Sequence, residues 1–228
     1  MRSILAIAGL VVVVGLGYLG FTFMNGSKQS DPSGRELSSI EEKLAVQGPM
    51  GDIALGDPNA PVTIYEYASL TCSHCGTFHR EIYPELKSKY IDTGKVRFIL
   101  RPFSFDGAAT AAFMLSRCAG DDRYYKFIDA LFDTQNLWIR GEDTMSALAG
   151  VAKQGGFTQE SFNACLQRAD ILADLQAVFK QGAEEVGVNS TPTLFINGEM
   201  FSGVPVNDAG QPDFAVFEKI LLKHLPES

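Results

Sequence analysis

The sequence predicts an α/β domain that carries an all-helical insertion. A β-branched and aromatic strand at 62–68 is followed by a helical segment and a second strand, which is the pattern of a βαβ unit. Residues from about 103 to 186 then have apolar side chains at helical spacing throughout. Strand chemistry returns at 193–202, before a last amphipathic helix at 213–225. The insertion therefore divides the β-strands into two groups.

The whole chain has the composition of an ordinary globular protein. Its 228 residues suffice for one large domain, and 46% are hydrophobic while 20% are charged. The net charge is -8 and no basic run occurs, which argues against nucleic acid as a partner. We interpret the acidity as a contribution to solubility.

The first 23 residues predict a targeting segment. Residues 4–23 carry no charge and follow Arg2, and a helix of this length spans about 30 Å, the thickness of a bilayer core. One interpretation is a signal anchor, with Arg2 left in the cytoplasm. The other is a cleaved signal peptide, with 4–14 as its apolar core and Gly15–Gly17 as the cleavage site. That site is poor and the apolar run continues to Phe23, which favours the anchor. Both interpretations place the remaining chain outside the cytoplasm.

Residues 24–48 predict a polar linker, rich in glycine, serine and proline, between the targeting segment and a domain at 49–228. One or two helical turns are expected near Leu37 to Leu44. The linker would hold the domain away from the membrane.

The elements that follow are predicted from residue type and period. A short strand at 52–56 precedes the strand at 62–68, and a helix should run from Cys72 to about Tyr90 with a kink at Pro84. Asn197-Gly198 predicts a β-hairpin turn between strands at 193–196 and 199–202. The other predicted elements are a strand at 95–100 and helices at 108–118, 124–132, 144–153, 161–166 and 171–186.

The central motif is a cysteine pair at the junction of a strand and a helix. Cys72 would lie at the helix N-terminus, where free N–H groups and the helix dipole stabilise a thiolate and lower the thiol pKa. Cys75, one turn further, would be more buried and would resolve a mixed disulfide. His74 can add a donor or a positive charge near Cys72, which would stabilise the reduced form and make the disulfide oxidising.

Two other uses of the cysteine pair are a metal site and a structural disulfide. Cys72, Cys75 and His79 have spacings that a zinc site can use, but structural zinc normally takes four ligands. The sequence has no second C-x-x-C and no H-x-x-x-H, so no metal is predicted. A purely structural disulfide between residues so close would be strained and would close very little chain.

The chain resembles the DsbA-like thiol:disulfide oxidoreductases of the thioredoxin superfamily. The resemblance rests on Cys72-Ser73-His74-Cys75 after an apolar strand, a helical insertion, and Ser190-Thr191-Pro192-Thr193 before a strand and hairpin. It covers about 52–225. It implies a thioredoxin-like fold, in which helices flank a central mixed sheet.

The resemblance also implies a surface for substrate. Thr191-Pro192 would be a cis peptide bond beside the cysteines, so that the Thr191 backbone can pair with an extended client segment. The alternative is a trans proline that opens a strand. Ser73 would contact the client as well. Ser73, where well-known members have proline, and Thr191, which isomerases also use, leave the redox potential open.

Glu66 corresponds to a buried acid that family members often keep beneath the disulfide. Such a carboxylate could relay a proton to or from Cys75. The alternative is an outward-facing glutamate paired with Arg97 or Arg101.

The family resemblance further implies a second, non-catalytic disulfide between Cys118 and Cys165 in the insertion. The alternative is two buried free thiols that act as small hydrophobic groups. We interpret Trp138 as a packing residue.

The predicted function is that of a periplasmic disulfide oxidase, tethered through residues 4–23. A client thiol would attack the Cys72–Cys75 disulfide, and a quinone-linked membrane oxidase of the DsbB type would regenerate it. We expect no organic cofactor and a monomer. The alternatives are a disulfide isomerase or reductant on the same fold, and a client-binding chaperone whose cysteines are incidental.

Overall fold

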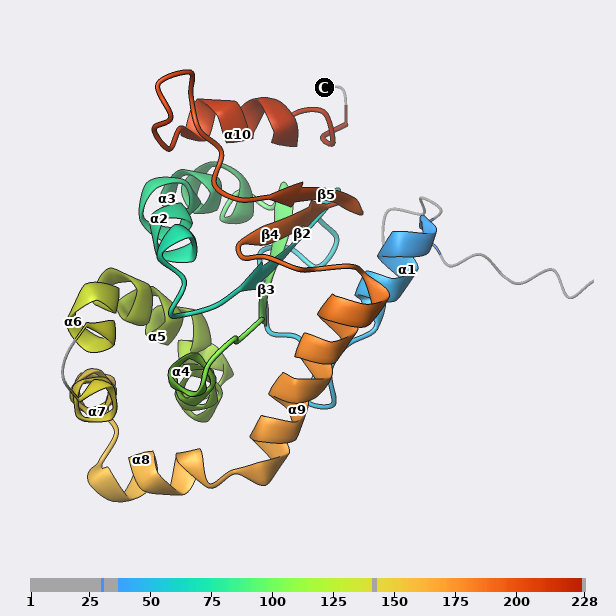
Figure 1. Ribbon diagram of the computed structural model, residues 1–228. Helices are drawn as coiled ribbons and strands as arrows, with labels where there is room; N and C mark the ends of the chain where they lie inside the picture. Colours follow the sequence, from blue (N-terminus) through green and yellow to red (C-terminus); the bar gives the residue numbers. More distant parts are fainter. Residues whose placement is uncertain (1–29, 31–36, 141–142, 227–228) are drawn as a thin grey trace, which may run out of the picture.

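The computed structural model describes Ser30, 37–140 and 143–226 (Figure 1). The predicted targeting segment at 1–23 lies outside these residues. Among the residues that the structure describes, no helix has the length and apolar character needed to cross a membrane.

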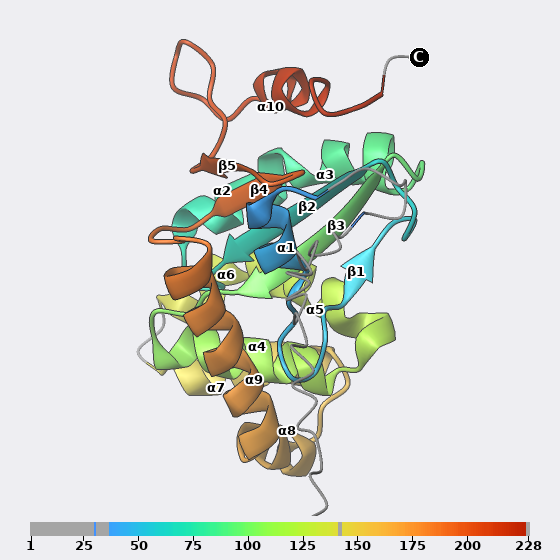
Figure 2. The ribbon, with the colours of Figure 1, turned by 90° about the vertical axis from the view of Figure 1, so that its right-hand side faces the viewer.

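A five-stranded mixed sheet forms the centre of the domain, with the order β1-β3-β2-β4-β5 (Figure 2). β2 and β3 are parallel and the other neighbours are antiparallel. The thioredoxin-like fold with a mixed sheet and a helical insertion is thus confirmed. The strands are β1 (Ala54–Leu55), β2 (Val62–Ala68), β3 (Val96–Pro102), β4 (Thr193–Ile196) and β5 (Glu199–Ser202).

β2 lies between β3 and β4, and its sequence reflects that position. Its first residues alternate between buried and half-buried side chains, but from Glu66 onward every side chain is buried. Elements therefore cover both faces of this end of the strand. Glu66 lies opposite Leu100 on β3 and Leu194 on β4, so its side chain points to the same face of the sheet as these two leucines.

The predicted helix after the cysteine pair is present in three pieces. α2 (Ser73–Glu81) ends with Ile82 as its C-cap, because Pro84 has no N–H and cannot continue the hydrogen-bond ladder. Pro84 lies in the first turn of the next helix, α3 (Tyr83–Leu86). A π-helical turn, η1 (Lys87–Ile91), completes the segment. α10 (Phe214–Leu221) packs against α3.

The helical insertion gathers below the sheet in Figures 1 and 2. The predicted helices are all present, with ends that differ by a few residues. α6 was not predicted, because five residues are too few to show a helical period. The insertion comprises α4 (Gly107–Cys118), α5 (Asp121–Asp133), α6 (Gln135–Ile139), α7 (Thr144–Gln154), α8 (Gln159–Leu166), α9 (Ala169–Lys180) and the π-helical η2 (Gln181–Glu185).

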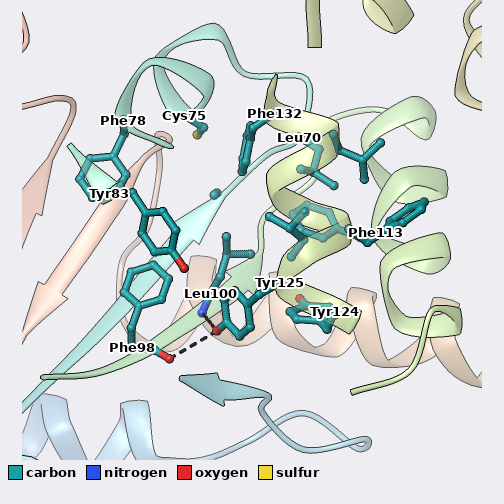
Figure 3. Close-up of a cluster of buried hydrophobic side chains, with 14 of the residues drawn as sticks. Leu70, Cys75, Phe78, Tyr83, Phe98, Leu100, Phe113, Tyr124, Tyr125 and Phe132 are labelled. Atoms are coloured by element: carbon teal, nitrogen blue, oxygen red, sulfur yellow. Dashed lines mark hydrogen bonds between the residues drawn. The ribbon is translucent and has the colours of Figure 1, made fainter. Parts of the chain in front are cut away.

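One large hydrophobic cluster joins the sheet to the insertion (Figure 3). Tyr125 of α5 lies within it, and its hydroxyl accepts from the Leu100 N–H at 3.0 Å and donates to the Ile53 carbonyl at 2.8 Å. Cys75 lies in the same cluster as Phe78 and Phe132. The Cys75 sulfur is therefore part of the core.

The last part of the predicted linker is folded. Ser38 and Glu41 form a capping box at the start of α1 (Ser39–Ala45), whose Leu44 is fully buried. The Arg101 guanidinium donates to the Leu44 carbonyl at 2.7 Å and to the Asp52 carboxylate at 2.7 Å. These contacts fasten α1 to the sheet on the face opposite Glu66.

The predicted hairpin between β4 and β5 is confirmed. Asn197 and Gly198 have φ values of 45° and 83°, the left-handed conformations that a tight two-residue hairpin turn requires. A side chain at Gly198 would also lie within 3.0 Å of atoms in Ser38, Ile40 and Glu41. The turn thus needs glycine both for its backbone and for its contact with α1.

Candidate active site

Cys72 and Cys75 lie at the start of α2, shortly after the C-terminal end of the central strand β2. Cys72 is the N-cap residue, with extended backbone angles (φ -74°, ψ 121°). Cys72 is half-buried and Cys75 is fully buried, and both are free thiols. Ser73 and His74 between them are exposed. The pair thus has one accessible and one inaccessible sulfur.

The surroundings of Cys72 favour its thiolate. The hydrogen bond from the Cys75 thiol is the largest cause that lowers the pKa of Cys72, to about 5. The Thr191 side chain and the backbone N–H groups of Cys75 and His74 act in the same direction, while partial burial opposes them. The helix N-terminus therefore contributes as predicted, but the neighbouring thiol contributes more.

The surroundings of Cys75 have the opposite effect. Burial raises the pKa of the Cys75 thiol well above its usual value, and the nearby Cys72 and Glu66 raise it further. At neutral pH the reduced pair therefore consists of a Cys72 thiolate and a Cys75 thiol.

The Thr191–Pro192 peptide bond is cis and lies beside Cys72. The Cys72 Sγ and the Thr191 carbonyl oxygen are 3.4 Å apart. The alternative of a trans proline is wrong. The Pro192 carbonyl accepts from the Gly203 N–H at 2.8 Å, which joins this turn to the segment after β5.

Glu66 is fully buried and faces the helix layer, where its Oε2 lies 2.8 Å from Nε2 of His79. The alternative of an outward glutamate paired with Arg97 or Arg101 is wrong. Glu66 lies opposite Leu100, and side chains alternate along β3, so both arginines lie on the other face. Arg101 pairs with Asp52 there.

From its spacing to the cysteines alone, His79 is a candidate only for a zinc ligand. It lies four residues after Cys75, on the side of α2 that faces β2, and its ring stacks on Phe132 with centroids 4.2 Å apart. The Nδ1 of His79 and the Oε1 of Glu66 are buried without a hydrogen-bond partner. Within 37–140 and 143–226, no group of three His, Cys, Asp or Glu side chains could hold a metal ion.

A polar hollow of about 220 Å³ begins at His79. Burial raises the pKa of Asp129 in its wall, while the nearby His79 opposes that rise. His79 thus borders the hollow and also contacts the buried Glu66, which does not line it. It is lined by His79, Tyr83, Pro84, Lys87, Asp129, Phe132 and Asp133.

Gln135 is a further residue of the candidate site that was not predicted from the sequence. It is the first residue of α6 and is only 3% exposed. Its Nε2 donates to the carbonyls of Leu70 at 2.9 Å and of Cys72 at 2.8 Å. No sequence signal marks a lone glutamine in so short a helix.

The other two cysteines form a disulfide that is separate from the site. Cys118 at the end of α4 and Cys165 in α8 are bonded across 47 residues of sequence. Trp138 is fully buried and donates from its Nε1 to the Leu131 carbonyl at 2.8 Å. It packs in the core.

Comparison with known proteins places this geometry in a family. A family model described as thioredoxin matches residues 49–212. The chain belongs to the thioredoxin superfamily. Within this superfamily it is DsbA-like: the crystal structure of Wolbachia pipientis alpha-DsbA1 is 30% identical, with a TM-score of 0.70 over 82% of this chain and 95% of that chain.

Two further relatives match this chain over different shares of their own length. A Bacillus cereus protein named probable disulfide bond formation protein D is 24% identical over 95% of this chain and 93% of its own length. A Rickettsia prowazekii protein, provisionally named protein-disulfide oxidoreductase, is 34% identical over 64% of this chain. The chain spans only 54% of the length of that rickettsial protein.

Proposed function

We propose that this chain is an extracytoplasmic thiol:disulfide oxidoreductase that introduces disulfide bonds into client proteins. The observation that carries the proposal is the contrast between the two active-site thiols. The pKa of Cys72 is lowered to about 5, while that of Cys75 is raised well above its usual value. One sulfur is thus an accessible, stable thiolate and the other is a buried thiol. The names of the Bacillus and Rickettsia relatives support the same activity.

The reaction begins with the Cys72–Cys75 disulfide. A client thiolate attacks Sγ of Cys72, and the electron pair of the broken bond leaves on Sγ of Cys75, which takes up a proton. A second client thiolate attacks the client sulfur of the mixed disulfide, and Cys72 leaves as a thiolate. The client has lost two electrons and gained a disulfide, and the pair is reduced.

The direction of electron flow follows from the Cys72 thiolate. Interactions that stabilise the thiolate stabilise the reduced form, because the oxidised form has no thiolate to stabilise. They also make Cys72 a good leaving group. An oxidase benefits from both effects, whereas a reductant needs a less stable dithiol. A membrane oxidase linked to quinone would then accept the electrons and restore the disulfide.

The client would bind beside Cys72. The exposed Ser73 and His74 flank the sulfur on one side, and the cis Thr191–Pro192 turn lies on the other. An extended client segment could pair with the Thr191 backbone there, which would bring any client cysteine to Cys72 without reading its sequence. We propose that the protein works as a monomer, tethered to the membrane through residues 4–23.

Glu66 and His79 would exchange the proton of Cys75. The buried thiol must lose its proton to attack a mixed disulfide and regain it when the disulfide opens. Glu66 lies close enough to raise the pKa of Cys75, and His79 joins Glu66 to the polar hollow. The charged and titratable groups around His79 are Glu66 from β2, Tyr83 from α3, Lys87 from η1, and Asp129 and Asp133 from α5.

The proposed function is tested with a reduced, unfolded client that has two cysteines and with the oxidised protein in excess. We expect one client disulfide per equivalent of oxidised protein, and a matching loss of the Cys72–Cys75 disulfide. The protein with Cys72 replaced by serine serves as the control. A client that stays reduced while it binds the protein would favour a chaperone. Rearrangement of a misbridged client by the reduced protein, without net oxidation, would favour an isomerase.

The first prediction concerns the titration of Cys72. Thiolate absorbance near 240 nm in the reduced protein should rise with a midpoint at about pH 5, and Cys72→Ser should remove this transition. Because the folded pKa lies below the usual value of 9.0, the thiolate stabilises the reduced fold fully above pH 9. This contribution decreases between pH 9 and pH 5 and is lost below pH 5. A midpoint near pH 8 would contradict the proposed chemistry.

The second prediction concerns the proton path. Glu66→Gln and His79→Gln should slow the attack of Cys75 on a glutathione mixed disulfide at Cys72, on the order of 10²-fold for Glu66→Gln. The release of glutathione is measured across pH 5–8. His224→Gln is a matched control, because His224 also lies beside a glutamate, with its Nε2 3.3 Å from Glu199. Glu199 is exposed, unlike Glu66. Equal rates in all four proteins would remove Glu66 and His79 from the mechanism.

A further inference from the structure

The side-chain amide of Gln135 links the helical insertion directly to the active-site loop, which is formed by residues 69–72 between β2 and α2. Its Nε2 uses both of its hydrogens on backbone carbonyls of the loop, those of Leu70 and Cys72. Both acceptors are main-chain atoms, so the contact fixes the path of the loop and not a particular side chain. α6, which carries Gln135, is itself anchored to α5 by Trp138.

The fit of Gln135 against α2 is close. A Cβ atom placed on Gly76 would lie 2.3 Å from Oε1 of Gln135, a distance that no real Cβ contact shows. Gly76 is buried and its N–H donates to the Cys72 carbonyl at 3.1 Å. The Cys72 carbonyl thus accepts two hydrogen bonds, one from within α2 and one from the insertion. The amide of Gln135 lies against the first turn of the helix that carries both cysteines.

We propose that Gln135 is a positioning residue that holds the Cys72 backbone in its N-cap conformation when the cysteines are reduced. The inference rests on the proposed function and concerns the same site. In the oxidised protein, the covalent bond to Cys75 itself restrains Cys72. In the reduced protein that bond is absent, and the place of the Cys72 sulfur depends on non-covalent contacts. Gln135 is therefore needed more in the reduced form than in the oxidised form.

This difference has a consequence for the chemistry. The backbone N–H groups of His74 and Cys75 stabilise the thiolate only if Cys72 stays at the helix N-terminus. Release of its carbonyl would let the loop move and weaken those contacts. Removal of the Gln135 amide should then destabilise the reduced form relative to the oxidised form, and make the protein a weaker oxidant.

The test is the redox equilibrium of Gln135→Met with glutathione. Methionine matches the length of glutamine but has no donor. We expect the equilibrium to shift about tenfold toward the oxidised protein, which corresponds to ~30 mV. The melting temperature should fall more in the reduced protein than in the oxidised protein, and the titration midpoint of Cys72 should rise. Gln135→Asn, whose shorter amide cannot span both carbonyls, should shift the equilibrium in the same direction and provides a second test if the methionine variant folds poorly.

The matched control is Gln181→Met. The side-chain amide of Gln181 also joins segments that are distant in sequence. Its Nε2 donates to the Lys43 carbonyl at 2.7 Å, and its Oε1 accepts from the Tyr67 hydroxyl at 2.6 Å. This contact lies on the other face of the sheet. Its loss should lower stability equally in both redox states and leave the equilibrium with glutathione unchanged.

Three outcomes separate the two proposals. An equilibrium within twofold of the wild type in both Gln135 variants, or an equal loss of melting temperature in the two redox states, would overturn the positioning role. Failure of the wild-type protein to oxidise a client would overturn the proposed function instead. The effect of the Gln135 variants on the redox equilibrium could still be measured in that case, because that equilibrium uses glutathione and not a client.

Discussion

Replacement of Cys72 by serine should abolish client oxidation, with a loss of 10³-fold or more. Cys72 is the accessible sulfur and the proposed site of the mixed disulfide, and no other thiol in the described part of the chain can take its place. Cys75 is buried, and Cys118 and Cys165 are bonded to each other. Loss of an essential nucleophile typically removes nearly all of an enzyme's rate. The measurement is the rate of disulfide formation in a reduced two-cysteine client.

Replacement of Cys75 by alanine should give a different result, and the comparison makes the test specific. Cys72 would then be a free thiolate with no resolving partner, so a client disulfide should be trapped on it as a stable mixed disulfide. Mass spectrometry of the trapped species should locate the bond at Cys72. Full client oxidation by Cys72→Ser, or a trapped bond at another cysteine, would contradict the assigned roles.

Removal of the Cys118–Cys165 disulfide should lower the free energy of unfolding by about 4 kcal/mol. The bond closes a loop of 47 residues of sequence separation, and chain entropy for a loop of this size gives that magnitude. In a chain of 228 residues, this is a fall of roughly 8–16 °C in melting temperature. Denaturant unfolding of Cys118→Ala/Cys165→Ala measures it.

The Cys72–Cys75 pair must not contribute to that measurement. Comparison in a background that carries Cys72→Ser and Cys75→Ala leaves Cys118–Cys165 as the one pair that a reductant can open in the described chain. Addition of a reductant should destabilise the Cys72→Ser/Cys75→Ala protein. It should have no effect on the protein in which all four cysteines are replaced. A loss below about 1 kcal/mol would mean that the unfolded chain is not constrained as expected.

Much of the fold could be predicted because its elements have strong local signals. β2 has the β-branched and aromatic residues of a buried strand, and Asn197-Gly198 marks the hairpin. The presence of the longer helices followed from their apolar period, although their ends differ from the predicted ones by a few residues. α6 could not be found in this way, since its five residues make little more than one turn. The hydrogen bonds from its Gln135 to the Leu70 and Cys72 carbonyls depend on tertiary packing.

The candidate site was predicted in part for the same reason. Cys72, Cys75 and Thr191-Pro192 belong to motifs that are readable along the chain. The partner of Glu66 is not, because His79 reaches it across the space between a strand and a helix. The alternation of side chains along β3 could have excluded Arg97 and Arg101, once the parallel register with β2 was known. Gln135 depends on where the insertion returns to the loop, which no local pattern shows.

The oxidising character of the Cys72–Cys75 pair is tested most directly by its equilibrium constant with glutathione at pH 7. It should be measured on the domain with Cys118 and Cys165 replaced by alanine, so that only the Cys72–Cys75 pair contributes to the measured equilibrium. We expect a potential well above the glutathione poise, in the range of about -120 to -180 mV that disulfide donors occupy. A potential near that of thioredoxin, about -270 mV, would mean that the pair donates electrons, and would contradict the oxidase.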